Sequence, residues 1–150
     1  MNVFRDLQGS QIWEMHGEWI RKETPVFASE IADRFALAEQ LSQKDHTKAE
    51  SLQKDITLRL SEQLGGDGVL VIPTVPGPAP LAGGSASTLE QNRNGALSLC
   101  CIAGLSGFPQ ITLPIKGPDG LPLGLSVIAA SGQDLRLLSW IQEIWKTEFL

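Results

Sequence analysis

What this sequence lacks excludes several kinds of function. It has no run of Lys or Arg, and its formal net charge is −5. A nucleic-acid surface is therefore not expected, because neutralising phosphates needs clustered positive charge. The longest apolar stretch, residues 96–105, is too short to cross a bilayer, and the first residues lack the apolar core of a signal peptide. We expect a cytoplasmic protein that binds neither nucleic acid nor membrane.

Cysteine and histidine are also scarce. The two cysteines, Cys100 and Cys101, are neighbours in the sequence, where a disulfide would strain the backbone. A metal site would need further donors at suitable spacing, and the only histidines are His16 and His46. We expect two reduced, buried cysteines that behave as small apolar residues, and neither a metal nor another cofactor.

The first part of the chain has the periodicity of helices. Apolar spacing predicts helices over residues 3–22, 31–41 and 47–64, and Thr47 with Glu50 fits a capping box. At 150 residues, 42% of them apolar, the chain is long enough for one domain, 1–150, with its own core. We divide this domain into a helical section, 1–64, and an α/β section, 65–150.

The second part alternates strand and helix patterns. Residues 69–73 are almost wholly apolar and predict a central strand, while 110–115 and 123–129 predict two more strands joined by a turn. Between them, residues 96–105 are hydrophobic on all sides, which predicts a helix buried on all sides. A final helix follows Asp134, with the inward stripe Leu137, Leu138, Ile141, Ile144 and Trp145. The predicted fold class is α/β, a mixed β-sheet flanked by helices.

Four blocks of the sequence carry a family resemblance. They are Val-Leu-Val-Ile-Pro-Thr-Val-Pro-Gly-Pro-Ala-Pro (69–80), Ala-Gly-Leu-Ser-Gly-Phe-Pro-Gln-Ile-Thr-Leu-Pro-Ile (103–115), Asp-Gly-Leu-Pro-Leu-Gly-Leu (119–125) and Gly-Gln-Asp-Leu-Arg-Leu-Leu (132–138). Their order and content resemble the C-terminal portion of the amidase signature family. Members of that family hydrolyse carboxylic amides with a nucleophilic serine, a second serine in a cis peptide and a lysine, which lie in a Gly/Ser-rich signature in the first half.

That catalytic signature has no counterpart here, so no catalytic residue is expected in this chain. Ser51-Leu-Gln-Lys54 matches a Ser-x-x-Lys pattern by chance, on an exposed, charged helix. Residues 83–87 lack the final glycine of a nucleophile elbow, and Ser106 has no base nearby in the sequence. The chain alone is predicted to be inactive.

The resemblance implies an indirect role in substrate binding. In the family, the proline-rich loop and the segment before the buried helix lie near the acyl pocket. This places Thr74, Val75, Pro76 and Arg93 as substrate-binding candidates, with Asn92 and Asn94 beside them. Arg93 is the one cation near them, and it either binds a substrate carboxylate or is a solvated loop residue.

Two functions follow from this reading. The first is the C-terminal portion of an amidase, which supplies sheet core and pocket wall for a small-molecule amide. This portion is either completed by an N-terminal amidase half or truncated from a longer gene product. The alternative is a non-catalytic remnant, or a small-molecule binding or interaction module, of the same fold. Because part of the apolar surface has no predicted cover, self-association of the isolated chain is also expected.

Overall fold

The computed structural model describes residues 2–148 as two compact units. The first unit extends to Asp55 and the second begins at Ile56, so the division falls inside helix α3 (Thr47–Leu64) rather than at its end. A helix or strand is present at each expected place, but the helix expected over residues 96–105 spans Ala86–Ser106, so Arg93 lies on a helix and not in a loop. The organisation as a single domain stays a prediction, and each unit is described by itself.

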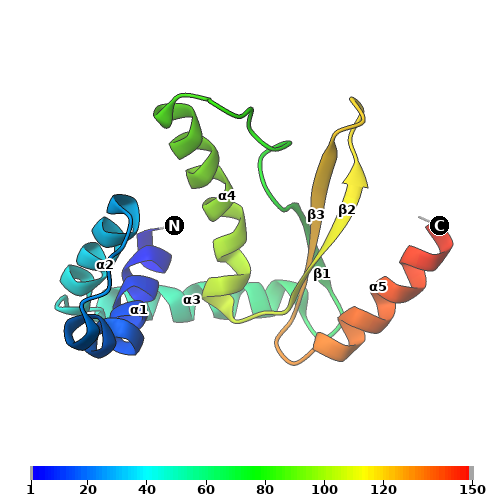
Figure 1. Cartoon of the computed structure of the whole chain (residues 1–150). Coiled ribbons are helices and arrows are strands. Elements are labelled where there is room, and N and C mark those ends of the chain that lie inside the picture. Colours follow the sequence, from blue (N-terminus) through cyan, green and yellow to red (C-terminus); the bar gives the residue numbers. More distant parts are fainter. Residues whose placement is uncertain (1, 149–150) are drawn as a thin grey trace. The chain divides into compact units, whose positions relative to one another are not determined.

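The first unit is a pair of helices, α1 (Asn2–Glu23) and α2 (Ser29–Ser42), which lie side by side in Figure 1. Trp13 of α1 and Leu41 of α2 are buried, and Leu41 contacts α1 at Gly9. The guanidinium of Arg21 donates a 2.8 Å hydrogen bond to the carboxylate of Glu39, so a surface ion pair also joins the two helices.

The start of α3 differs from the expected capping box. The amide and the hydroxyl of Thr47 both donate to Oδ1 of Asp45, over 2.9 and 2.6 Å, while the amide of Glu50 bonds the carbonyl of His46. The prediction that Thr47 and Glu50 form the cap is therefore wrong. Asp45 reaches the first free amide because its short carboxylate precedes the helix, as in an Asx turn.

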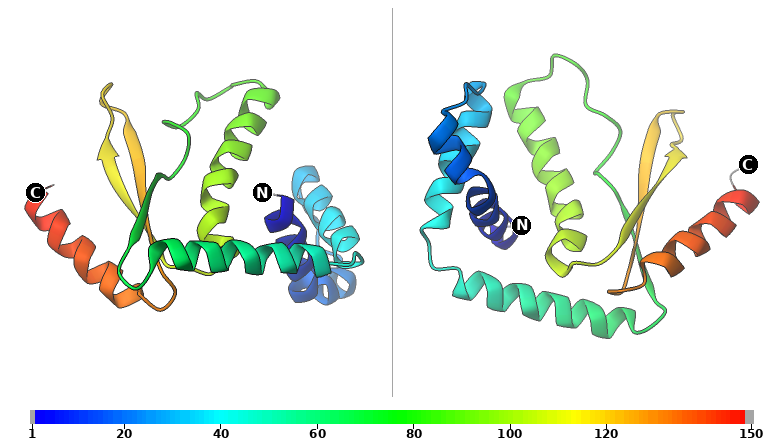
Figure 2. Two further views of the ribbon diagram at one scale, coloured as in Figure 1. Left: turned by 180° about the vertical axis from the view of Figure 1, so that it is seen from behind. Right: turned by 60° about the horizontal axis from the view of Figure 1, so that its bottom comes forward.

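The second unit contains a three-stranded sheet of order β1-β3-β2 (Figure 2). Its strands are β1 (Val69–Pro73), β2 (Gln110–Lys116) and β3 (Pro122–Ala129). Both pairings are antiparallel, so the sheet flanked by helices is confirmed but its expected mixed strand direction is not found in the described chain. A tight turn, closed by the 2.9 Å bond from the Gly117 amide to the Leu121 carbonyl, reverses the chain between β2 and β3.

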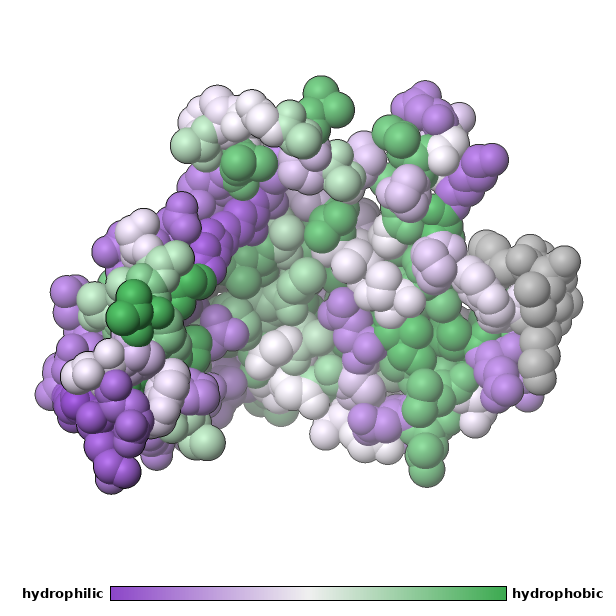
Figure 3. All heavy atoms as spheres, in the orientation of Figure 1, coloured by the Kyte–Doolittle hydropathy of each residue, from purple (hydrophilic) through white to green (hydrophobic). Residues whose placement is uncertain are grey.

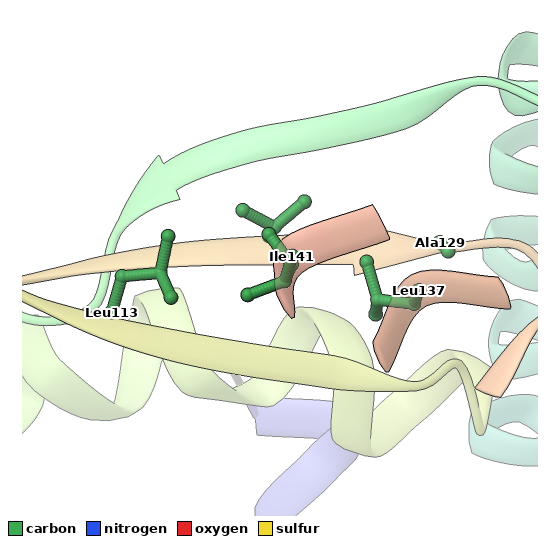
Figure 4. Packing of buried hydrophobic residues seen from close by; sticks show 5 residues of the cluster. Leu113, Ala129, Leu137 and Ile141 are labelled. Carbon is green, nitrogen blue, oxygen red and sulfur yellow. The ribbon is translucent and has the colours of Figure 1, made fainter. Parts of the chain in front are cut away.

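Helices cover both faces of this sheet. Leu137 and Ile141 of α5 (Asp134–Glu148) pack against Leu113 and Ala129 on one face (Figure 4). On the opposite face, Ile128 packs against residues of α3 and of α4 (Ala86–Ser106). The adjacent β3 residues Ile128 and Ala129 therefore face opposite sides of the sheet, as the two-residue period of a strand predicts.

The described chain covers less apolar surface than the sequence predicted. β1 is an end strand of the sheet, not a central one, and Val71 is 51% exposed. Helix α4 is not buried on all sides: Cys101 is buried but Cys100 is exposed, which corrects the expectation for that thiol. Leu138, expected on the inward stripe of α5, is exposed. Figure 3 shows hydrophobic atoms at the surface over the second half of α4 and near the beginning of α5.

The physical reason is the number of covering elements. An apolar strand needs neighbours on both edges and layers on both faces, and within residues 2–148 no strand pairs with the outer edge of β1. An apolar pattern therefore predicts what a segment can bury, while the available neighbours decide what it does bury.

Candidate functional site

The second unit has a groove of about 470 Å³, which is larger than a second hollow of about 180 Å³ in the same unit. This volume lies in the range of small-molecule sites, about 300–1,000 Å³. The groove is formed by the proline-rich loop after β1, one face of α4 and the first residues of β3. Its lining residues are Val75, Pro76, Gly77, Pro78, Ala79, Pro80, Leu89, Asn92, Arg93, Ala96, Pro122, Leu123 and Gly124.

Two glycines allow the proline-rich loop to lie close to β3 and α4. A Cβ on Gly124 would lie 2.6 Å from Oγ1 of Thr74, and one on Gly95 would lie 2.6 Å from Cγ of Pro76. The amide of Thr74 also donates a 2.9 Å hydrogen bond to the carbonyl of Gly124. The loop is thus held where any larger side chain at these glycines would push it away.

A buried hydroxyl cluster fixes the root of the same loop. Ser126 of β3 is fully buried, and its Oγ lies 2.7 Å from Oγ1 of Thr74 and 3.1 Å from Oγ1 of Thr112. It also accepts a 2.9 Å hydrogen bond from Nε2 of Gln110. One donor and two acceptors are the full capacity of a hydroxyl, so Ser126 is satisfied. Thr74 is therefore anchored to the central strand.

The helical wall of the groove is one face of α4. Leu89, Arg93 and Ala96 follow one another at spacings of four and three residues, with Asn92 beside them, which puts all four on one side of the helix. Ser85 begins this helix: its Oγ accepts the amide of Thr88 over 3.2 Å. The helix is therefore started by a side-chain cap just outside the groove.

The structure brings most of the predicted site residues together. Val75, Pro76 and Arg93 line the groove, and so does Asn92. Thr74 is not a lining residue but anchors the loop, and Asn94 does not line the groove. The substrate-binding role of these residues stays a prediction.

Sequence reasoning missed Ser126, Gln110 and Thr112 as partners of Thr74. The available signal was polar side chains inside apolar strands: Ser126 stands between Leu125 and Val127. Their convergence could not be predicted, because it depends on the pairing register that sets Thr112 opposite Ser126.

A second, smaller hollow of about 180 Å³ lies beside α5. Nη1 and Nη2 of Arg136 donate to the carbonyls of Gly66 and Asp67, over 3.0 and 2.7 Å, at its rim. Both contacts tie α5 to the loop before β1, so this arginine has a structural task.

Within residues 2–148, no helix combines the length and the apolar character that crossing a membrane requires. Among the side chains of residues 2–145, no three His, Cys, Asp or Glu residues gather in a way that could hold a metal ion.

Comparisons of the sequence and of the structure with known proteins identify the same group of relatives. The family model described as Amidase matches residues 2–138. Amidase 1 of Oryza sativa subsp. japonica is 37% identical, with 97% of this chain and 34% of that protein covered. Outer envelope protein 64, chloroplastic, of Arabidopsis thaliana is 30% identical, with 96% and 24% covered.

A solved structure has the same fold over nearly the whole chain. The structure described as crystal structure of amidase superposes with a TM-score of 0.75 at 24% identity, and the alignment covers 95% of this chain and 34% of that one. This chain therefore spans about a third or less of the length of the proteins it matches. Because the family model covers residues 2–138, the chain belongs to the amidase family.

Proposed function

We propose that this chain is the C-terminal portion of an amidase-signature hydrolase and supplies the sheet core and one wall of the substrate pocket. The family match over residues 2–138, together with the groove beside the proline-rich loop, supports this proposal. In it, Val75, Pro76 and Arg93 contact the acyl part of an amide substrate. Thr74 holds the loop in place through Ser126.

The catalytic serines and lysine of the reaction belong, in this proposal, to an N-terminal amidase half outside this chain. The environments of Ser85 and Ser106 agree with this view. Oγ of Ser85 bonds the hydroxyls of Ser87 and Thr88, and Oγ of Ser106 bonds the carbonyl of Ile102 over 2.9 Å. None of these contacts is with a group that could act as a general base.

A specific comparison favours the alternative, a non-catalytic module of the same fold. The relative from the chloroplast envelope is named for its location and not for an activity, although 96% of this chain aligns with it. A module of this kind would keep the groove for binding and would need no catalytic residues. The location of this protein in the cell would help to decide between the two functions. The cytoplasmic location expected from the sequence stays a prediction.

A chimera separates the two proposals. The aligned third of Oryza sativa Amidase 1 is replaced by this chain, and hydrolysis of simple aryl and aliphatic amides is measured beside the intact enzyme and this chain alone. We expect turnover from the chimera and none from the chain alone. A soluble, folded chimera without turnover would favour the non-catalytic module, and turnover by the isolated chain would contradict both.

Copurification tests the partner directly. The tagged chain is isolated from its own cells, and bound polypeptides are identified by mass spectrometry. An associated polypeptide carrying a Gly/Ser-rich amidase signature is the expected result. Recovery of the chain with no such segment, either associated or on the same polypeptide, would count against the missing-half proposal.

A further inference from the structure

The groove has an uneven distribution of charge. Arg93 is the only ionisable side chain among its described lining residues; the others are apolar residues, prolines, two glycines and Asn92. Among the described side chains, those of residues 2–145, no carboxylate forms an ion pair with Arg93. The guanidinium is therefore available to an anion that enters the groove.

The position of Arg93 on α4 makes this charge part of the groove. Leu89 and Ala96, one turn before and after it on the same helix face, are also lining residues. Across from them lie the prolines of the loop, which offer apolar surface and a rigid backbone. A ligand that fits both features has an apolar chain and one negative group.

The net charge of the whole chain bears on whether an anion can bind in the groove. Its formal net charge is −5, so an anion is repelled by the protein as a whole. Any preference for an anion over a neutral ligand must then come from a local cation. A guanidinium binds a carboxylate through two parallel hydrogen bonds, which an ammonium group cannot do.

We propose that the groove selects amides whose acyl chain carries a carboxylate at the end distant from the amide, and that Arg93 is the residue that selects them. This inference rests on the proposed function, because it names the substrate class of the same groove. Arg93 acts in it as a specificity-determining residue, which binds the remote carboxylate while the apolar chain lies along the prolines.

Three amides of equal chain length test the proposal on the chain as it exists. The probes are hexanamide, adipamate (the monoamide of adipic acid, with a terminal carboxylate) and aminohexanamide, with a terminal ammonium group. Binding is followed by NMR shifts of the backbone amides of Val75, Gly77 and Ala96. We expect adipamate to bind about three- to tenfold more tightly than hexanamide, and aminohexanamide to bind least well.

Two matched substitutions assign the effect to one side chain. Arg93→Gln should abolish the ratio by which adipamate binds more tightly than hexanamide, while Arg93→Lys should keep part of it. Arg59→Gln removes the same charge from an exposed position of α3 that does not line the groove. This control should leave all three affinities as they are.

Three outcomes would contradict the inference. Equal binding of all three amides would overturn the role of Arg93 and leave the pocket-wall function standing, because the groove would still bind amides. Equal loss of the preference in Arg59→Gln and Arg93→Gln would overturn it too, since net charge would then explain the effect. If none of the three amides binds, both the inference and the proposed function are contradicted.

Discussion

Gly95 of α4 and Pro76 of the proline-rich loop are in such close contact that a Cβ on the glycine would lie 2.6 Å from Cγ of the proline. Real Cβ contacts are essentially never this short, so the loop and the helix can meet here only because residue 95 is glycine. The same contact sets the position of one groove wall, since Pro76 is a lining residue. Function and packing are thus coupled at this pair.

Gly95→Ala should displace Pro76 and weaken binding of hexanamide to the groove. Overpacking costs about 1–3 kcal/mol, but alanine is favoured over glycine in a helix by about 1 kcal/mol, so we expect a net loss of stability of about 1 kcal/mol. Urea unfolding and NMR titration measure the two effects. Gly66→Ala is the control, because a Cβ there meets nothing within 4 Å and Gly66 does not line the groove. Equal binding by both variants would show that the contact does not set the groove.

Ser126→Ala should destabilise the second unit by about 1–3 kcal/mol, because it removes a fully buried hydroxyl that bonds the partly buried Thr74 and Gln110 and the exposed Thr112. Thr112→Val removes a hydroxyl from the exposed side of the same cluster and should have a smaller effect. Free energies of unfolding in urea make the comparison. A larger loss in Thr112→Val than in Ser126→Ala would mean that the cluster does not centre on Ser126.

Leu137→Ala should destabilise the protein by about 2–5 kcal/mol, the usual range for a truncated core leucine. Leu137 is 2% exposed and packs against the sheet, whereas its neighbour Leu138 is 55% exposed. Leu138→Ala is therefore the matched control, and we expect a change within about 0.5 kcal/mol. Thermal or urea unfolding followed by circular dichroism distinguishes the two. Similar losses would indicate that both leucines are buried in solution.

The carboxyl group of Asp45 should titrate below its ordinary pKa of 3.8, because the hydroxyl and then the amide of Thr47 bond its charged form. A lowered pKa in the folded state means that the stabilisation is present above the unfolded pKa and is lost as the pH falls through the folded one. Asp45→Ala should therefore be less stable than the parent at neutral pH, with the difference vanishing at a pH well below 3.8.

Carbon-detected NMR measures the Asp45 pKa directly. Thr47→Ala, which removes the hydroxyl donor and keeps the amide, should move this pKa back toward 3.8. An unchanged pKa in that variant would show that the hydroxyl is not the main cause.

The isolated chain should self-associate, because β1 ends the described sheet and Val71 on it is 51% exposed. Light scattering at micromolar concentration measures the association. Val71→Lys should reduce it, since a charged side chain on an end strand opposes pairing with another strand. Leu58→Lys is the control, an exposed leucine of α3 outside the sheet. A monodisperse, cooperatively melting parent protein would contradict the prediction and favour a stand-alone module.

Local structure was accessible from the sequence alone. Helical spacing predicted the helices, the turn residues at 117–120 predicted the reversal between two strands, and four ordered blocks indicated the family. These features depend on residues near one another in the chain. Short-range sterics and the periodicity of side chains are enough to determine them.

The tertiary structure alone decided how distant residues meet. Nothing near Thr74 in the chain indicated that it would meet Ser126, 52 positions later, or that β1 would end the sheet, because both depend on strand order and register. The place of Arg93 in the groove was left open between two readings, and the packing of α4 against the proline-rich loop put it among the lining residues. The burial of Cys101 but not of Cys100 also depends on tertiary packing. Only one face of α4 packs against other elements of the described chain, and adjacent residues of a helix point in different directions.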